Sequence, residues 1–367
     1  MTGIQDSGCT AGPADADIPS CTCGPDKTGR SCCPPSGAGG PSPIRDTTGT
    51  ITPADRLDHF LARWGWKRGT RHRVEPGLYR LGAPSPDSPV FASANYTLSF
   101  DALRSALAGT DAWILVLDTK GINVWCAAGK GTFGTEELAG RIRSTGLAGM
   151  VAHRTIIVPQ LGAPGISWPE VMRRSQFRVE FGTVRAADLP EYLKTHAANP
   201  AMRTVEFPLR DRLVLAPMEF VHAALPMLVA ATALWFLAGP VVALAAISAV
   251  LAGTVIFPAL LPYLPTRDFS TKGLILGVAV AIPFAVVSGT DPVLPGWAEA
   301  AGAAAALLLI PAVIAYLALN FTGSTTFTSR TGVKKEIFRY VPIMALMAGT
   351  GSVLGVILGI SRLLGVI

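Results

Sequence analysis

Five long apolar stretches in the last 150 residues constrain the fold more than any other feature of this chain. They lie at residues 220–238, 241–261, 273–289, 300–319 and 341–360, and none of them contains Asp, Glu, Lys or Arg. Each stretch is close to the roughly 20 residues that a helix needs to cross a bilayer. We therefore predict that residues 218–367 form an all-α membrane domain of five transmembrane helices.

The positions of basic residues predict how these helices are oriented. The basic residues beside the stretches gather on one side: Arg210, Arg212, Arg267, Lys272, Arg330, Lys334, Lys335 and Arg339. The opposite loops, 239–240 and 290–297, carry no Lys or Arg, and only Arg362 in the short tail departs from the pattern. Since cytoplasmic loops are enriched in Lys and Arg, we expect a multi-pass protein of the cytoplasmic (inner) membrane. Its N-terminal domain would be cytoplasmic and its C-terminus outside.

Residues 1–52 have the composition of a segment without a packed core. They contain 9 Gly and 7 Pro and almost no large apolar side chains. Five of the six cysteines also lie there: Cys9, Cys21, Cys23, Cys32 and Cys33. Such a segment buries too little surface to offset the entropy of ordering, so we predict a disordered tail with reduced thiols. A tail that scavenges soft metals is the less favoured alternative. Zinc or iron–sulfur ligation has little support, because no C-x-x-C pair is present.

Residues 53–217 alternate strand-like apolar runs with helix-like segments. The runs are 90–92, 113–117, 155–158, 177–181 and 213–215, and the helical segments are 99–107, 136–144, 168–174 and 189–196. Continuous apolar strands separated by helices indicate a parallel sheet with helices on both faces. We therefore predict a Rossmann-like α/β domain. Its ligand would bind beyond the carboxyl ends of the strands, at loops 93–97, 118–134 and 159–165.

The segment after the second of these runs carries the most informative chemistry. A strand ends near Asp118, a Gly-containing loop follows, and Asn123 can cap a short helix that carries Cys126. The helix dipole and the charge of Lys130, one turn further on, both favour the thiolate form of such a thiol. Taken alone, however, a single cysteine on an apolar segment is most often a small buried hydrophobic residue.

Residues 123–130, which read NVWCAAGK, resemble the cap-helix motif of the mercury-methylating corrinoid proteins (the HgcA family). Further stretches that resemble this family are 76–79, 93–96, 159–165 and 211–215. Residues 321–336 resemble a stretch of the related corrinoid iron–sulfur protein of the acetyl-CoA pathway. The resemblance covers about residues 53–367 and leaves out the cysteine-containing tail.

The resemblance implies a bound corrinoid, a cobalamin-type cobamide with a central cobalt, in the soluble domain. Cys126 would be the catalytic residue and the lower axial ligand of the cobalt. The residues implied to bind the cofactor are Ser93, Asn123, Val124, Trp125, Cys126, Ala127, Ala128, Gly129, Lys130, Gln160, Gly162 and Ala163. A histidine-ligated corrinoid site would show the pattern D-x-H-x-x-G, and none of the five histidines lies in such a pattern.

The expected function is a membrane-anchored corrinoid-dependent methyltransferase of anaerobic metabolism. It would transfer a methyl group from cobalt to inorganic Hg(II) and form methylmercury. Because Hg(II) is an electrophile, the methyl group must leave as an anion or a radical. A thiolate supports this better than imidazole does, since it donates more charge to cobalt.

Two alternatives remain, a near one and one from another functional class. The first is a corrinoid methyl carrier of acetyl-CoA (C1) metabolism. The iron–sulfur relatives with that function carry an N-terminal cluster motif, which the cysteine spacing here does not reproduce. The second is a transporter with a cytosolic regulatory domain. Ion-coupled transport usually needs ionisable groups near the middle of the membrane. The five apolar stretches contain no Asp, Glu, Lys or Arg, so a transporter is disfavoured.

The resemblance also implies partners. A ferredoxin-like protein with two iron–sulfur clusters would act as reductant and could donate Hg(II). The methyl group would come from a methyl donor protein or a methyl-tetrahydrofolate-type source. Membrane lipid is a further expected partner. Nucleic acid is not, because the net charge of +6 is spread thinly along the chain and not gathered in a basic stripe.

Overall fold

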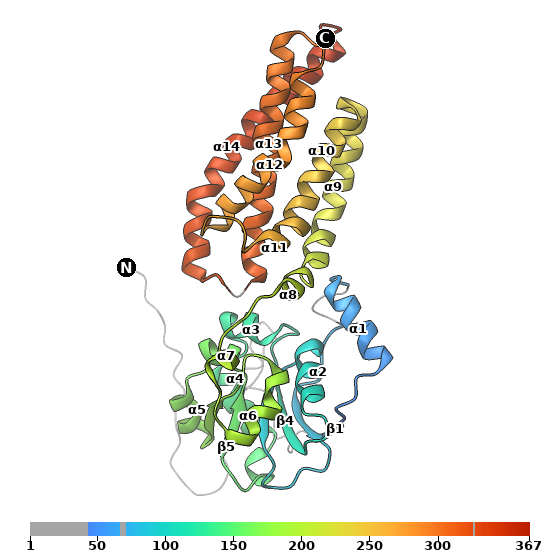
Figure 1. Ribbon diagram of the computed structural model, residues 1–367. Helices are drawn as coiled ribbons and strands as arrows, with labels where there is room; N and C mark the ends of the chain where they lie inside the picture. The colour runs from blue at the N-terminus through green and yellow to red at the C-terminus, as the bar shows by residue number, and fades with distance from the viewer. Residues whose placement is uncertain (1–42, 67–70, 326) are drawn as a thin grey trace, which may run out of the picture. The chain divides into compact units, whose positions relative to one another are not determined.

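The computed structural model describes residues 43–66, 71–325 and 327–367, which form an α/β part and a set of long apolar helices (Figure 1). The predicted tail lies outside the described residues as far as residue 42. Beyond that point, Arg45–Thr47 form strand β1 and pair with Tyr79–Leu81. The α/β part therefore begins before residue 53, earlier than predicted.

The sheet of the α/β part has six strands in the order β1-β2-β4-β3-β5-β6. The other strands are β2 (Gly77–Leu81), β3 (Val90–Ala94), β4 (Ala112–Leu117), β5 (Thr155–Val158) and β6 (Arg178–Phe181). Neighbouring strands are parallel except for β2 and β4, which are antiparallel. The sheet is therefore mixed, and the prediction of a purely parallel sheet is wrong at the edge formed by β1 and β2.

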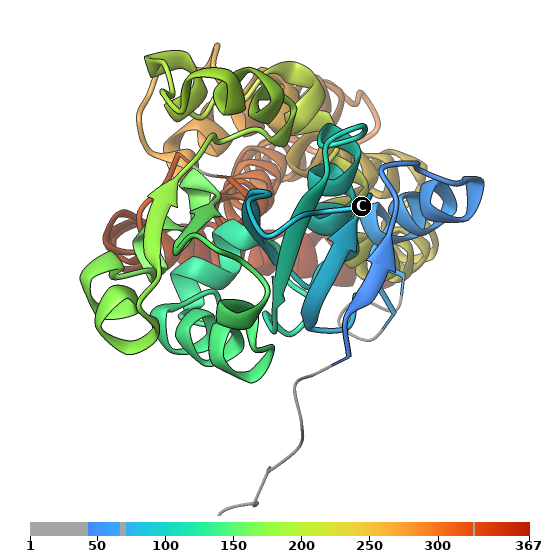
Figure 2. The same ribbon diagram turned by 90° about the horizontal axis from the view of Figure 1, so that it is seen from below.

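Helices cover both faces of this sheet (Figure 2), as the apolar strands predicted. The helices are α2 (Thr97–Ala106), α3 (Val124–Lys130), α4 (Thr135–Ser144), α5 (Trp168–Ser175) and α6 (Leu189–Thr195). Strand β4 faces both layers, because successive side chains of a strand point to opposite faces. Its Leu115 packs with residues of α3, α4 and α5, whereas Ile114 packs with residues of α2 and α6.

The predicted strand at 213–215 is wrong. Helix α8 (Leu209–Leu213) ends there, and residues 214–215 connect it to the first long helix. A run of three apolar residues does not distinguish a strand from a buried helical turn, so periodicity could not decide this position. The short helix α7 (Pro200–Arg203) precedes α8.

Helix α1 (Pro53–Arg63), which the sequence analysis missed, is tied to α2 by a buried charge network. The Arg104 guanidinium donates to Asp101 and Asp55 over 2.6 and 2.8 Å, and His59 Nε2 lies 2.7 Å from Asp101. Burial acts against ionisation of Asp55, but hydrogen bonds from Thr52 and Arg104 hold the pKa of its carboxyl below the ordinary value. The network fixes the inner face of α1 on the domain.

Five helices in the remainder of the described chain are long and apolar enough to cross a membrane. These segments are Leu209–Ala238, Pro240–Leu260, Phe269–Gly289, Gly296–Ser324 and Thr331–Leu363. The second segment contains two helices, α10 (Pro240–Leu251) and α11 (Phe257–Leu260). The main helices of the other four segments are α9 (Ala216–Ala238), α12 (Phe269–Gly289), α13 (Gly296–Phe321) and α14 (Arg330–Leu363). The number of segments matches the five predicted spans, and each begins before its predicted first residue.

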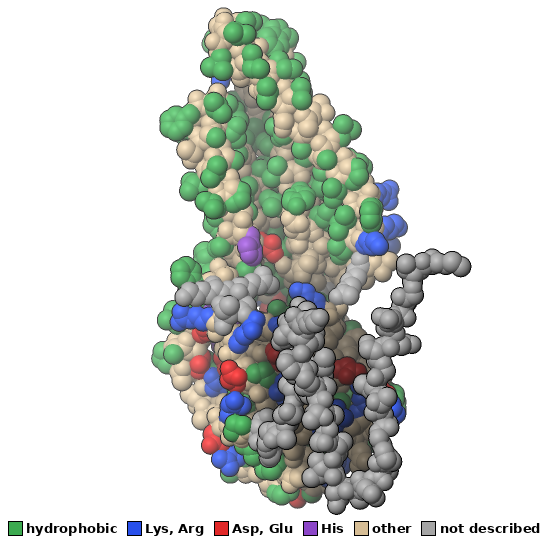
Figure 3. All heavy atoms as spheres, turned by 180° about the vertical axis from the view of Figure 1, so that it is seen from behind, with side chains coloured by type: hydrophobic (Ala, Val, Ile, Leu, Met, Phe, Trp, Pro, Cys, Tyr) green, Lys and Arg blue, Asp and Glu red, His purple; other side chains and the backbone are tan. Residues whose placement is uncertain are grey.

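Hydrophobic side chains cover the long helices, whereas charged side chains gather on the α/β part (Figure 3). Helices α12 and α13 approach closely through glycines. A Cβ built on Gly277 would lie only 2.4 Å from the Cα of Pro311. Small residues that let backbones approach are typical of helix contacts in membranes.

Candidate functional site

A cavity of about 480 Å³ opens at the carboxyl ends of the parallel strands. Its lining includes Phe91 and Ala92 of β3 and Ile157 and Val158 of β5, which are neighbouring strands. From β3 the chain crosses to β4 on one side, and from β4 it returns past β3 to β5 on the other. Ligands of open α/β sheets bind at such a reversal of strand order. The strand order therefore accounts for the position of this cavity.

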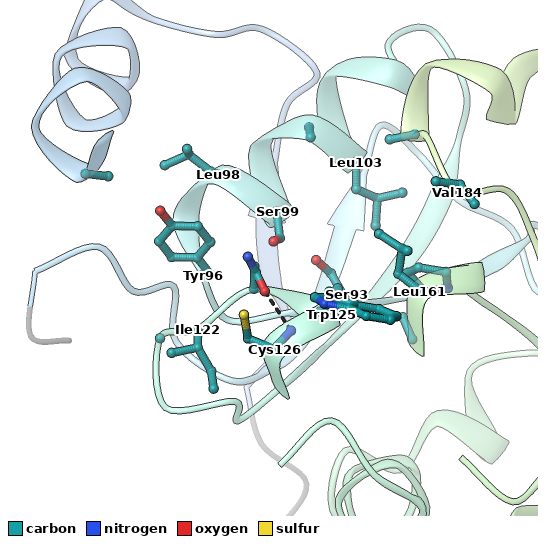
Figure 4. A pocket seen from close by; sticks show the side chains of 18 of the residues that line it. Ser93, Tyr96, Leu98, Ser99, Leu103, Ile122, Trp125, Cys126, Leu161 and Val184 are labelled. Carbon is teal, nitrogen blue, oxygen red and sulfur yellow. Dashed lines mark hydrogen bonds between the residues drawn. The ribbon is translucent and has the colours of Figure 1, made fainter. Parts of the chain in front are cut away.

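Helix α3 presents Cys126 to the cavity. Asn123 caps the helix as predicted, since its Oδ1 accepts the backbone N–H of Cys126 over 2.9 Å. Figure 4 shows the half-buried Cys126 sulfur pointing into the pocket toward Tyr96 and Leu98. The rest of the helix fixes this direction, because Ala127 and Ala128 are buried against the sheet.

The loop that leads into α3 is wrapped around the side chain of Asn95, which follows β3 and is only 3% exposed. Asn95 Oδ1 accepts the backbone N–H groups of Thr119 and Gly121 over 3.0 and 2.9 Å. Its Nδ2 donates to Asp118 Oδ1 over 3.2 Å. Gly121 adopts a φ of +72°, a conformation that favours glycine. One buried amide thus connects the end of β3 to the loop between β4 and α3, which ends at Asn123.

The structure brings about half of the predicted site residues together around the cavity. Those that line it are Ser93, Asn123, Val124, Trp125, Cys126 and Lys130. Ala127, Ala128 and Gly129 do not line it, because they lie on the side of α3 that packs on the domain or at its end. Ala127 and Ala128 are buried and serve the packing of the helix, whereas Gly129 is exposed.

Three predicted residues of the loop after β5 also lie away from the cavity. In the short helix η2 (Gln160–Gly165), Gln160 Oε1 accepts a hydrogen bond from Arg203 over 2.9 Å. Gly162 is packed on Phe133, where a Cβ would lie 2.5 Å from the ring. Ala163 is also absent from the lining, and Leu161 reaches the cavity instead. The loop was predicted correctly, but not the side chains that face inward.

Several lining residues were not among the predicted site residues, although Tyr96, Gly121, Ile122 and Pro159 lie in the loops that were predicted to bind the ligand. They are Arg63, His72, Tyr96, Leu98, Ser99, Ala102, Leu103, Gly121, Ile122, Pro159, Gly182, Thr183, Val184, Ala186, Leu189, Val214, Leu215, Met218, Gly323 and Ser324. The spacing of Ser99, Ala102 and Leu103 on α2 is that of one helix face and could have signalled them. The loop after β6 could have been included because it too follows a parallel strand.

The side chains around the cavity suit a metal whose other ligands come from a cofactor. In the described part of the chain, no group of three or more His, Cys, Asp or Glu side chains could hold a metal ion. A single thiol in an apolar cavity suits a macrocycle-bound cobalt. Leu98, Trp125 and Leu161 offer apolar contacts to a flat ring. The hydroxyl of the half-buried Ser99 is available to its amide edge, whereas the buried Ser93 hydroxyl donates to the carbonyl of Ala94. The residues present therefore fit a corrinoid.

Comparison with known proteins places the similarity on this region. The family described as "CO dehydrogenase/acetyl-CoA synthase delta subunit" matches residues 69–171. That segment holds β2, β3, β4, α3 and β5. The chain is thus similar to this family over the residues that build most of the cavity.

Curated relatives show the same partial match. The acetyl-CoA decarbonylase/synthase complex subunit gamma of Methanopyrus kandleri is 35% identical over 123 residues, covering 33% of this chain and 26% of the relative. The subunit gamma of Archaeoglobus fulgidus is 36% identical over 93 residues, which cover 25% and 20%. That of Methanothermobacter thermautotrophicus is 31% identical over 122 residues, covering 33% and 26%. The chain spans about a quarter or less of the length of these relatives.

Proposed function

We propose that this chain is a membrane-anchored corrinoid protein that takes part in methyl transfer, with Cys126 as the lower axial ligand of the cobalt. The observation that carries the proposal is the Cys126 sulfur, which points from the first turn of α3 into the cavity. The similarity to subunit gamma of the acetyl-CoA decarbonylase/synthase complex supports it. The corrinoid iron–sulfur protein of the acetyl-CoA pathway carries a methyl group on a corrinoid and is related to the family that residues 123–130 resemble.

A bound corrinoid supplies a cobalt atom that accepts and releases a methyl group. Cys126 would hold this cobalt through its sulfur, and its thiolate would donate charge toward the metal. The Asn123 cap and the buried Ala127 would keep the sulfur in place. The apolar wall around Trp125 and Leu161 would exclude water from the reacting centre.

We propose inorganic Hg(II) as the methyl acceptor. The support is the resemblance of residues 123–130 to the mercury-methylating proteins, together with five long apolar helices that lie outside the residues matched by the family model. A methyl carrier for acetyl-CoA synthesis is the second candidate function. The comparisons favour this second candidate, because each reported relative is named as a subunit of that complex.

The two acceptors are separated by offering both to the same preparation. The full chain is purified without oxygen, loaded with methylated corrinoid and incubated with Hg(II), or with acetyl-CoA synthase, CO and coenzyme A. We expect the visible spectrum of a corrinoid and the formation of methylmercury. Acetyl-CoA without methylmercury would favour the carrier function, and a colourless protein that binds no corrinoid would contradict both.

We further propose that the five long helices span the cytoplasmic membrane, with the α/β domain in the cytoplasm. A ferredoxin-like protein with two iron–sulfur clusters would reduce the cobalt from that side, and the methyl group would come from a donor protein or a methyl-tetrahydrofolate-type source. Reporter fusions after Gly289 and Ile367 should report the outside, and a fusion after Phe321 the inside. An outside location of the α/β domain would contradict this arrangement, because low-potential electrons are supplied in the cytoplasm.

A further inference from the structure

Helix α1 carries an apolar surface that the domain does not cover. Leu57, Phe60 and Trp64 follow the three- and four-residue spacing of one helix face and are 57%, 55% and 40% exposed. The rings of Phe60 and Trp64 contact each other, with centroids 5.8 Å apart. Trp66, just beyond the helix, is 56% exposed. We call these four side chains the α1 apolar face.

The end of α1 holds Trp66 beside this face. Gly65 adopts a φ of +73° and donates its N–H to the carbonyl of Ala62, and Trp66 donates its N–H to the carbonyl of Leu61. This pair of bonds is the Schellman arrangement that closes many helices. The position of Trp66 is therefore fixed by the backbone, and both indoles belong to one ordered surface.

The charges of α1 are sorted between its two sides. The acidic side chains turn inward, since Asp55 accepts from Arg104 and Asp58 lies 2.8 Å from the Nδ1 of the buried His72. The exposed charges beside the apolar face are basic, namely Arg56 and Arg63. In the sequence, Lys67 and Arg68 follow directly. An apolar, aromatic face beside outward basic side chains is typical of a helix that lies on an anionic lipid surface.

The end of α1 lies beside the beginning of the long apolar helices. A Cβ built on Gly65 would lie 2.9 Å from the sulfur of Met218, in the first turn of α9 (Figure 1). Helix α9 belongs to the first segment that is long and apolar enough to span a membrane. Tryptophan and arginine are enriched where such a segment meets the lipid headgroups.

We propose that the α1 apolar face lies in the headgroup region of an anionic bilayer and gives the α/β domain a second lipid contact besides the spanning helices. Leu57, Phe60, Trp64 and Trp66 insert among the upper acyl chains, and Arg56 faces the lipid phosphates. The proposal rests on the membrane placement proposed above but not on the corrinoid.

The test is tryptophan quenching in the full chain, reconstituted in nanodiscs that contain lipid brominated in the upper acyl chain. The chain has 7 tryptophans, and Trp235 and Trp297 of the long helices provide a quenched reference. The double variant W64F/W66F removes the two indoles of the α1 apolar face. The matched control is Trp168→Phe on α5, because Trp168 is as exposed as Trp66, 55% against 56%.

If the α1 apolar face contacts lipid, W64F/W66F lowers the bromine-quenched fraction of the emission, whereas Trp168→Phe raises it by removing an unquenched indole. The quenching lost in W64F/W66F is also greater with anionic than with zwitterionic lipid and decreases with salt. If W64F/W66F raises the quenched fraction, the face does not touch lipid and its occupant is the N-terminal segment or another protein. That outcome overturns the proposal. A loss of quenching at Trp235 and Trp297 would show a failure of the membrane placement instead.

Discussion

Replacement of Cys126 by alanine is expected to abolish methyl transfer while the fold survives. The variant loses the sulfur that points into the cavity, so we expect the rate to fall by about 100-fold or more, which corresponds to about 2.7 kcal/mol in the barrier. Stability should change by less than about 1 kcal/mol, because Cys126 is only half buried. Single-turnover methyl transfer and thermal unfolding of the purified variant measure the two effects.

Two further variants separate the role of the sulfur from other effects of losing a thiol. Cys126→His offers imidazole, which also binds cobalt but donates less charge, so we expect low activity and a spectrum shifted toward that of histidine-ligated corrinoids. Serine replacements of the tail cysteines leave the pocket thiol intact and should retain transfer; these residues are Cys9, Cys21, Cys23, Cys32 and Cys33. Parental activity in Cys126→Ala would mean that Cys126 is only a packing residue.

Loss of the Asn95 amide is expected to have the second large effect. Asn95→Ala leaves the backbone N–H groups of Thr119 and Gly121 without their acceptor. Each buried unsatisfied group costs about 1–3 kcal/mol, so the loss of two partners should lower the free energy of unfolding by about 2–6 kcal/mol. Corrinoid affinity should fall as well, because this loop leads directly into α3. Denaturant unfolding and titration with the corrinoid test both expectations.

Replacement of Asn95 by aspartate tests whether this side chain positions the loop before α3, apart from its effect on stability. Asn95→Asp keeps the accepting oxygen but turns the Nδ2 that donates to Asp118 into a second oxygen. The two carboxylates then repel each other, and we expect corrinoid affinity to fall. The double variant N95D/D118N restores a donor between the two side chains and should recover most of the affinity. An Asn95→Asp protein as competent as the parent, with no gain from the second change, would show that this hydrogen bond does not position the loop.

Local signals in the sequence predicted the centre of the α/β part. Residues 112–117 are an unbroken apolar run and form β4, because a strand between two helical layers is buried on both faces. Asn123, which follows a Gly-containing loop, predicted the cap of α3, and its side chain makes that hydrogen bond. These elements depend on neighbours within a few residues, so their sequence was sufficient.

The elements that the sequence did not predict depend on distant contacts. Strand β1 is three polar residues long and exists through its pairing with β2, and β2 joins the sheet antiparallel to β4. Helix α1 has an exposed apolar face, and its docking comes from Arg104, which lies 49 residues from Asp55. No periodic pattern within a short window contains this information.

The cavity lining shows the same division between local and distant information. The loops that approach it follow from strand ends, but the choice of Leu161 over Gln160 depends on which way the short helix η2 is turned. The contributions of Met218 and Ser324 come from segments far along the chain. A complete lining therefore required the three-dimensional arrangement of all these segments.

X-ray absorption at the cobalt edge tests the central claim most directly. The full chain and Cys126→Ala are reconstituted without oxygen with the same corrinoid, and the atoms around cobalt are identified from the extended fine structure. We predict a sulfur neighbour of cobalt in the parent protein and its absence in Cys126→Ala. A parent spectrum that contains only nitrogen, oxygen and carbon neighbours and does not change in the variant would contradict the assignment of Cys126 as the cobalt ligand.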